Sequence, residues 1–289
     1  MPIAAGAASG KGEIALYIGK RKFEESGKTY IMGILNVTPD SFSDGGSYTD
    51  EESILRRVRA MIREGADIID VGGESTRPGF TPVPLKEELE RVMPAIRLIK
   101  TETDIPVSVD TTKAAVAEKA IREGADLIND VSGLRADPEM GRVIADSGLP
   151  CILMHDRGEI CKADRAEEYL PLLISEMSEI AEKAVKAGIS RDMIILDPGI
   201  GFSKTWEQNM MILANPGCLK KTGFPILLGA SRKSVIGRAL ELAGNERDEA
   251  TAALSVIAAR EGLSFVRVHD ILSNKRAVMM TEALYPFGL

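Results

Sequence analysis

The chain has 289 residues, a formal net charge of −7 and a pI of about 5.2, which argue against general affinity for nucleic acid or for an anionic membrane surface. Hydrophobic residues make up 44% and charged residues 27%, as in soluble globular proteins, and no run approaches the roughly 20 apolar residues of a membrane-spanning helix. Residues 1–11 lack the basic start and apolar core of a secretory signal. Three cysteines in no pairing motif indicate free thiols and a reducing cytoplasm.

Short apolar runs alternate with amphipathic segments along most of the chain. The runs predict buried parallel strands over residues 31–36, 67–71, 106–109, 126–129, 150–154, 193–196, 225–228 and 264–268. The amphipathic segments predict helices over residues 50–64, 86–101, 112–123, 138–147, 167–187, 205–214, 247–261 and 271–284. This alternation predicts a single-domain α/β protein with the TIM (β/α)8 barrel fold, and a doubly wound open sheet is the alternative.

A repeated sequence supports the alternation of helices and strands. Residues 63–70 (REGADIID) recur as residues 122–129 (REGADLIN), and weaker copies begin at Lys186 and Arg260. Each copy places a basic residue and a glycine between a helix and a strand, where glycine accepts the left-handed conformation that ends many helices. Ahead of the first strand, residues 12–30 alternate around a Gly-Lys turn and predict a short β-hairpin that closes the lower end of the barrel.

Polar residues follow the predicted strands at their carboxyl ends, which converge on one mouth of a barrel where active sites form. One group contains Asp110, Asn129, Asp197 and Lys233. Two carboxylates and an amide suit a flat ligand with several N–H donors, such as an aminopyrimidine ring, and the lysine would donate to a carbonyl of that ring. The alternative is that these residues only cap elements or form salt bridges.

A second group comes from the first and last predicted strands, which are neighbours in a closed barrel. It contains Asn36, Arg267 and His269. Arginine offers a fork for phosphate oxygens, histidine adds a donor, and the asparagine oxygen suits a hard cation such as Mg²⁺. The group therefore predicts a diphosphate site, although His269 by itself would more often be structural. His155 is not assigned, and two histidines without a Cys-x-x-Cys motif are too few for a zinc site.

Two glycine-rich segments, residues 38–49 and 72–84, are candidate lids over this mouth, with ordinary surface loops as the alternative. A third segment, the turn after Asp197, carries Phe202. Its ring can stack on a planar ligand or simply pack against the protein, and the sequence does not decide between the two.

In order along the chain, these motifs resemble the dihydropteroate synthase family over about residues 30–280. The motifs are Asn36–Gly46, Glu74–Gly79, Ser108–Thr111, Ile128–Asp130, Asp197–Gly199, Ser231–Ser234 and Arg267–His269. The resemblance implies a transferase of folate biosynthesis that joins 6-hydroxymethyl-7,8-dihydropterin diphosphate to 4-aminobenzoate, giving 7,8-dihydropteroate and diphosphate. It also implies Mg²⁺ as a cofactor, inhibition by sulfonamides, small-molecule substrates rather than nucleic acid or membrane as partners, and a homodimer formed through later helices.

The resemblance also implies roles for single residues. Asp110, Asn129, Asp197 and Lys233 would hold the pterin, and Asn36, Arg267 and His269 would hold diphosphate and Mg²⁺. Thr76, Arg77 and Ser234 would line the aminobenzoate side, with Pro78 and Phe202 as apolar walls. Asp44 or Asp40 would stabilise a cationic methylene left when diphosphate departs. The expected catalytic residues are Asp44, Arg77, Lys233, Arg267 and His269.

The chain departs from the usual family pattern near the fifth and sixth strands. Asp156 stands where methionine is usual after the histidine, Ile200 replaces phenylalanine, Ser203 replaces glycine and Gln208 replaces histidine. Three other functions remain open from the residues: a pterin- or folate-dependent methyltransferase, a non-catalytic relative that binds a pterin or a protein, and an aldolase or isomerase with Lys233 as the Schiff-base lysine.

Overall fold

A computed structural model of the chain describes residues 16–24, 27–37, 51–74 and 83–288. Eight strands pair in the order β8-β7-β6-β5-β4-β3-β10-β9, all parallel, and a parallel bridge between Leu196 and Ile226 joins the two ends of the sheet. The strands are β3 (Tyr30–Asn36), β4 (Ile68–Gly72), β5 (Val107–Asp110), β6 (Leu127–Asp130), β7 (Cys151–Met154), β8 (Ile194–Asp197), β9 (Leu227–Leu228) and β10 (Phe265–Val268). The predicted barrel is therefore confirmed, and the open sheet is excluded.

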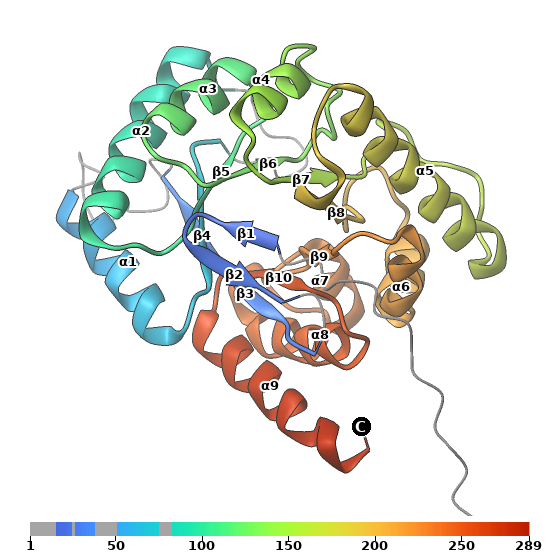
Figure 1. Cartoon of the computed structure of the whole chain (residues 1–289). Helices are drawn as coiled ribbons and strands as arrows, with labels where there is room; N and C mark the ends of the chain where they lie inside the picture. Colours follow the sequence, from blue (N-terminus) through green and yellow to red (C-terminus); the bar gives the residue numbers. More distant parts are fainter. Residues whose placement is uncertain (1–15, 25–26, 38–50, 75–82, 289) are drawn as a thin grey trace, which may run out of the picture.

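Helices surround the barrel as an outer ring (Figure 1). They are α1 (Glu51–Glu64), α2 (Leu85–Glu102), α3 (Ala114–Arg122), α4 (Met140–Ser147), α5 (Ala166–Lys186), α6 (Trp206–Ala214), α7 (Ser234–Leu240), α8 (Asp248–Arg260) and α9 (Ile271–Leu284). Short 3-10 turns lie at Arg191–Met193, Pro216–Thr222, Gly244–Glu246 and Tyr285–Phe287. The sequence did not predict α7 because this helix has only seven residues and starts inside a polar motif.

The repeated sequence ends helices with a left-handed glycine, as predicted. Gly65 and Gly124, which follow α1 and α3, have φ values of +97° and +100°. The aspartate after each glycine accepts a hydrogen bond from a neighbouring strand: Asp67 Oδ2 from the Ile31 amide at 2.8 Å and Asp126 Oδ2 from the Val107 amide at 2.8 Å. The repeat thus ends a helix and fixes the start of an adjacent strand.

The predicted hairpin is present and closes the lower end of the barrel. Strands β1 (Leu16–Ile18) and β2 (Arg21–Phe23) are antiparallel, and they lie across the centre of the barrel in Figure 1. Leu16, Ile18 and Phe23 are buried, and they form one apolar cluster with side chains from the amino ends of the barrel strands. Burial of this apolar surface fixes the hairpin in place.

Side chains alternate along each barrel strand, so that every second residue faces the interior. Leu127 of β6 belongs to the lower apolar cluster, and Asn129 lies one inward position higher. In the same way Phe265 of β10 lies below Arg267. The alternation therefore places an apolar layer at the bottom of the barrel and a polar layer at its mouth.

Two expectations from composition concern helices and thiols. Within the described residues, no helix is long and apolar enough to cross a membrane. Cys151, Cys161 and Cys218 are all free thiols, as their spacing predicted.

Candidate active site

Arg267 joins three strands at the barrel mouth. Its Nε donates to Asp70 Oδ2 and its Nη2 donates to Asp110 Oδ2, each at 2.6 Å. Asn129 Nδ2 donates to the same Asp70 oxygen at 3.2 Å. Burial alone would lower the pKa of Arg267, but Asp70 and Asp110 raise it above the ordinary value, so that the guanidinium is a fixed positive charge.

Two oxygens of this cluster have no partner among the described residues. Asp70 Oδ1 and Asp110 Oδ1 are buried and accept no hydrogen bond within the described part of the chain. Buried polar atoms are nearly always satisfied, so an orphan pair at a barrel mouth points to a ligand with donors. Burial raises the pKa of Asp110 to about 7, with the Arg267 charge opposing the rise.

Asp197 and Lys233 form a second cluster. Asp197 Oδ1 accepts from the Gly199 amide at 2.7 Å, and burial raises the pKa of this carboxyl while the Lys233 charge opposes the rise. Lys233 Nζ donates to the Ile200 carbonyl at 2.5 Å and lies 4.5 Å from the centre of the Phe202 ring. Burial lowers the pKa of Lys233 to about 8, and the Asp197 charge opposes this fall.

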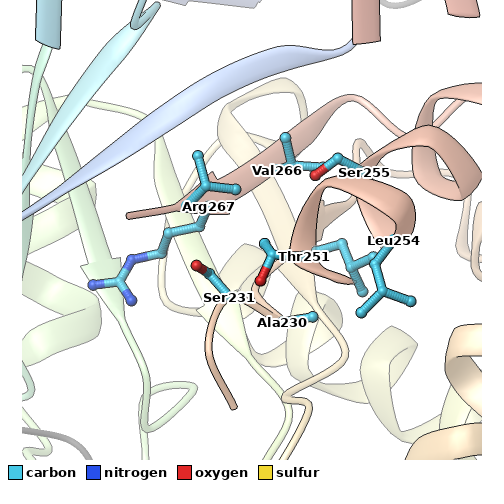
Figure 2. Close-up of a pocket in the computed structure, with 9 residues that line it drawn as sticks. Ala230, Ser231, Thr251, Leu254, Ser255, Val266 and Arg267 are labelled. Atoms are coloured by element: carbon cyan, nitrogen blue, oxygen red, sulfur yellow. The ribbon is translucent and has the colours of Figure 1, made fainter. Parts of the chain in front are cut away.

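The predicted diphosphate residues lie on the adjoining part of the mouth. Asn36 ends β3, and Gly72 separates it from Asp110 in the register of the sheet. His269 follows β10; its Nδ1 is 2.9 Å from Ser231 Oγ, and its carbonyl accepts from Arg57 Nη2 at 2.9 Å. Figure 2 shows the Arg267 side chain extending past Ser231, away from a cavity of about 10 Å³.

The structure thus brings the predicted residues of both groups to one mouth. Ser234 begins α7 and is exposed beside Lys233. The residues predicted on the two candidate lids lie outside the described residues, and their roles remain predictions: Asp40, Asp44, Thr76, Arg77 and Pro78.

Comparison with known proteins identifies the family. A family model for pterin binding enzymes matches residues 32–269. Dihydropteroate synthase of Clostridium beijerinckii is 50% identical to this chain, over 92% of the chain and 98% of that protein. The chain belongs to the dihydropteroate synthase family.

Solved structures of the family agree with the fold. The Clostridium difficile enzyme, solved in the presence of pteroic acid, has a TM-score of 0.85 and 45% identity, covering 90% of this chain and 98% of that one. The Xanthomonas albilineans enzyme with 4-aminobenzoic acid has a TM-score of 0.88 and 37% identity, covering 95% and 99%. The activity expected from the motifs, a transferase that makes dihydropteroate, is confirmed by these relatives.

Two of the departures from the family pattern have structural consequences. Ser203 has a φ of +42°, a left-handed conformation that favours the glycine usual in the family. Gln208 forms a capping box with Thr205 at the start of α6 and donates to the Ala163 carbonyl at 2.8 Å. Both residues lie in the turn and helix that follow Asp197 along the chain.

The sequence did not single out a buried cluster at this turn. Lys204 Nζ donates to the carbonyls of His155 and Phe202 at 3.1 and 3.0 Å and lies 3.1 Å from His155 Nδ1. His155 Nε2 is 2.9 Å from Glu176 Oε2. Burial lowers the pKa of Lys204 to about 7. The cluster ties the end of β7 to the turn that carries the Ile200 carbonyl, which accepts from Lys233.

Asp70 and Ser231 were also missed as site residues. Asp70 lies inside the apolar run of β4, and its only signal is its spacing, since it faces inward two residues after Ile68. Ser231 was noted only as the first residue of a motif.

Proposed function

We propose that Asp110, Asn129, Asp197 and Lys233 hold the pterin ring of the diphosphate substrate. The observation that carries this assignment is the pair of orphan oxygens, Asp70 Oδ1 and Asp110 Oδ1. A pterin presents several N–H donors in one plane and a ring carbonyl. The carboxylates supply acceptors for the donors, and Lys233 supplies a donor for the carbonyl.

The same ring position directs the substrate's diphosphate toward Arg267 and His269. In the reaction, the methylene C–O bond breaks and its electron pair leaves with diphosphate, which leaves a cationic methylene on the pterin. The arylamine nitrogen then forms the new C–N bond and releases a proton. The charge of Arg267 stabilises the departing anion, because the guanidinium is already held in place by Asp70 and Asp110.

Asn36 fits the expected role as a protein ligand of Mg²⁺. Within the described residues its side-chain amide makes no hydrogen bond, so its oxygen is available at the mouth beside Gly72. No group of three or more His, Cys, Asp or Glu suited to a metal occurs in that part of the chain. A cation here would depend on substrate oxygens, as Mg²⁺ commonly does, and would neutralise charge on the leaving diphosphate.

The test is diphosphate release from 6-hydroxymethyl-7,8-dihydropterin diphosphate, with and without Mg²⁺ and 4-aminobenzoate. We expect release that depends on Mg²⁺, together with formation of dihydropteroate when the arylamine is present. Saturable pterin binding without any release would contradict the proposal and favour a methyltransferase or a non-catalytic relative.

We also propose that the chain is a homodimer through α8 and α9. Six of the twelve large apolar side chains exposed in the described residues lie on these helices and the following turn: Ile257, Leu272, Met279, Met280, Leu284 and Phe287. A second copy would remove this surface from water. Sedimentation should give a dimer for the wild type and for Val185→Glu, changed at an exposed apolar residue of α5, and a monomer for Met280→Glu. A monomeric wild type at all concentrations would overturn the proposal.

A further inference from the structure

Two consecutive cations, Arg232 and Lys233, extend in different directions from the turn between β9 and α7. Lys233 Nζ donates to the Ile200 carbonyl at 2.5 Å and lies 4.5 Å from the centre of the Phe202 ring, both on the turn after β8. The Arg232 guanidinium instead donates to both carboxylate oxygens of Asp248 at 2.7 and 2.6 Å. One cation thus belongs to the barrel mouth, and the other is bound to the start of α8.

The backbone of this turn has a conformation that arginine seldom adopts. Arg232 has a φ of +56°, in the left-handed region where the Cβ of any residue except glycine crowds the backbone. Lys233 follows it directly and precedes the first residue of α7. The direction of the Lys233 side chain therefore depends on a strained residue that needs support from the rest of the protein.

The start of α8 supplies this support on both sides of the strained residue. The Arg232 amide donates to Thr251 Oγ1 at 3.3 Å, and the Arg232 carbonyl accepts from Arg247 Nη1 at 3.0 Å. Thr251, which Figure 2 shows beside the end of β9, is 2% exposed, and its hydroxyl donates to the Arg247 carbonyl at 2.8 Å. The amide, carbonyl and guanidinium of Arg232 are thus all bonded to one end of one helix.

Arg247 also fixes the helix that follows Lys233. Its Nε and Nη2 donate to the Leu242 carbonyl, just after α7, at 3.0 and 2.7 Å. Gly237 of α7 leaves room for the guanidinium, since a Cβ at this position would lie 2.1 Å from Arg247 Nη2. The start of α8 therefore holds α7 at both ends, and the Arg232 turn is the end that carries Lys233.

We infer that Arg232 is a positioning residue, whose ion pair with Asp248 holds the left-handed turn that directs Lys233 at the pterin ring. The inference rests on the proposed role of Lys233 in binding that ring. The Arg232 charge does not act on the ligand, because its guanidinium is bound to α8. Without the pair, the turn can relax toward right-handed conformations, and the lysine amine loses its fixed position.

An ion pair that only stabilised the fold would change unfolding and leave ligand binding unchanged, so binding to the folded protein is the decisive measurement. The probe is pteroic acid, with Kd measured by calorimetry at a temperature where urea unfolding shows each variant to be folded. Asp248→Ala removes the pair without changing the residue in the turn. We expect Kd to rise about 10-fold in Asp248→Ala and in Arg232→Ala, as when a group that orients a ligand-binding residue is lost. The double variant should bind no more weakly than Arg232→Ala, because the two side chains act as one unit.

Arg97→Ala is the matched control. Arg97 of α2 donates to both carboxylate oxygens of Glu123 at 2.6 and 3.0 Å, at the end of α3 and away from the mouth. It therefore loses a similar pair between adjacent helices, and its Kd for pteroic acid should equal that of the wild type.

A second cycle tests whether the effect passes through Lys233. Lys233→Met should raise Kd by itself, and adding Arg232→Ala to it should raise Kd no further. Wild-type Kd values in Asp248→Ala and Arg232→Ala would overturn the inference and leave the proposed function intact, and so would a further rise on adding Arg232→Ala to Lys233→Met. A wild-type Kd in Lys233→Met would contradict the proposed role of Lys233 and overturn the inference with it.

Discussion

Arg267 and Asp70 form a 2.6 Å ion pair at the barrel mouth although 197 residues separate them in the chain. Asp70 is fully buried, and the same guanidinium also holds Asp110 at 2.6 Å. One cation thus orders two carboxylates whose other oxygens accept no hydrogen bond from the residues that the structure describes. The pair therefore fixes both the charge that we propose acts on the leaving group and the acceptors expected to bind the pterin.

Asp70→Asn tests this arrangement. We expect kcat/KM to fall roughly 100-fold, which corresponds to about 2.7 kcal/mol, because Arg267 loses a charged partner and can shift. The free energy of unfolding should fall as well, by up to about 3 kcal/mol, as when a buried pair is broken. Steady-state kinetics and urea unfolding measure the two effects.

The matched control for Asp70 is Asp67→Asn, at the residue just before the same strand begins. Asp67 binds Arg21 at 2.5 Å and Lys275 at 3.0 Å, far from the mouth. It should lose stability while kcat/KM stays within about two-fold of the wild type. Equal catalytic losses in the two variants would mean that Asp70 acts only through stability.

Asn36→Ala tests the metal assignment. If the Asn36 oxygen is a ligand of Mg²⁺, the Mg²⁺ concentration for half-maximal activity should rise about 10-fold or more, with activity partly restored at high Mg²⁺. Asn215→Ala, at the exposed C-terminal end of α6, should not change the Mg²⁺ dependence. An Mg²⁺ titration of Asn36→Ala that overlays the wild type would contradict the role.

Much of the fold could be predicted because the local signals agree with the tertiary structure. The strands begin and end within two residues of the predicted bounds, because most of the apolar runs follow a helix that ends at a left-handed glycine. The missed helix α7 (Ser234–Leu240) has neither the length nor the apolar spacing that predicts a helix. Its backbone depends on the left-handed Arg232 before it, which α8 holds from a later part of the chain.

The sequence predicted the site residues at strand ends but not those whose roles depend on contacts between distant parts of the chain. Asp110 is the last residue of an apolar strand and Asn129 the last but one, and these positions place both at the mouth. Asp70 lies within its strand, and its role in the site is visible only from its hydrogen bond with Arg267 of β10, which the tertiary structure forms. Lys204 has the sequence context of a surface lysine, and its burial follows from three acceptors brought together by the turn after β8.

Lys204→Met tests whether the buried cluster of Lys204, His155 and Glu176 stabilises the turn after β8, which carries the Ile200 carbonyl. The substitution leaves the His155 and Phe202 carbonyls without their donor, so we expect the free energy of unfolding to fall by about 1–3 kcal/mol. The turn holding the Ile200 carbonyl should also loosen, and the Kd for pteroic acid measured by calorimetry should rise about 10-fold. Lys220→Met, which removes an exposed lysine bonded to the Glu261 carbonyl, should leave this Kd unchanged. Equal Kd values for Lys204→Met and wild type would show that the cluster does not affect the turn.

His155 predicts a pH dependence of stability. Burial lowers its pKa from 6.5 to about 3, assisted by the charges of Lys204 and Arg157 and opposed by Asp156; Glu176 faces its Nε2. Between these two values the unfolded chain binds a proton that the folded protein does not, so stability is lost as the pH falls below 6.5. The loss attributable to this one group is up to about 1.4 kcal/mol per pH unit. Urea unfolding from pH 7 to pH 4.5 should therefore show a shallower loss in His155→Gln than in the wild type. Parallel curves would mean that the folded protein accepts the proton, which would place a second cation beside Lys204 and contradict a neutral His155 at that position.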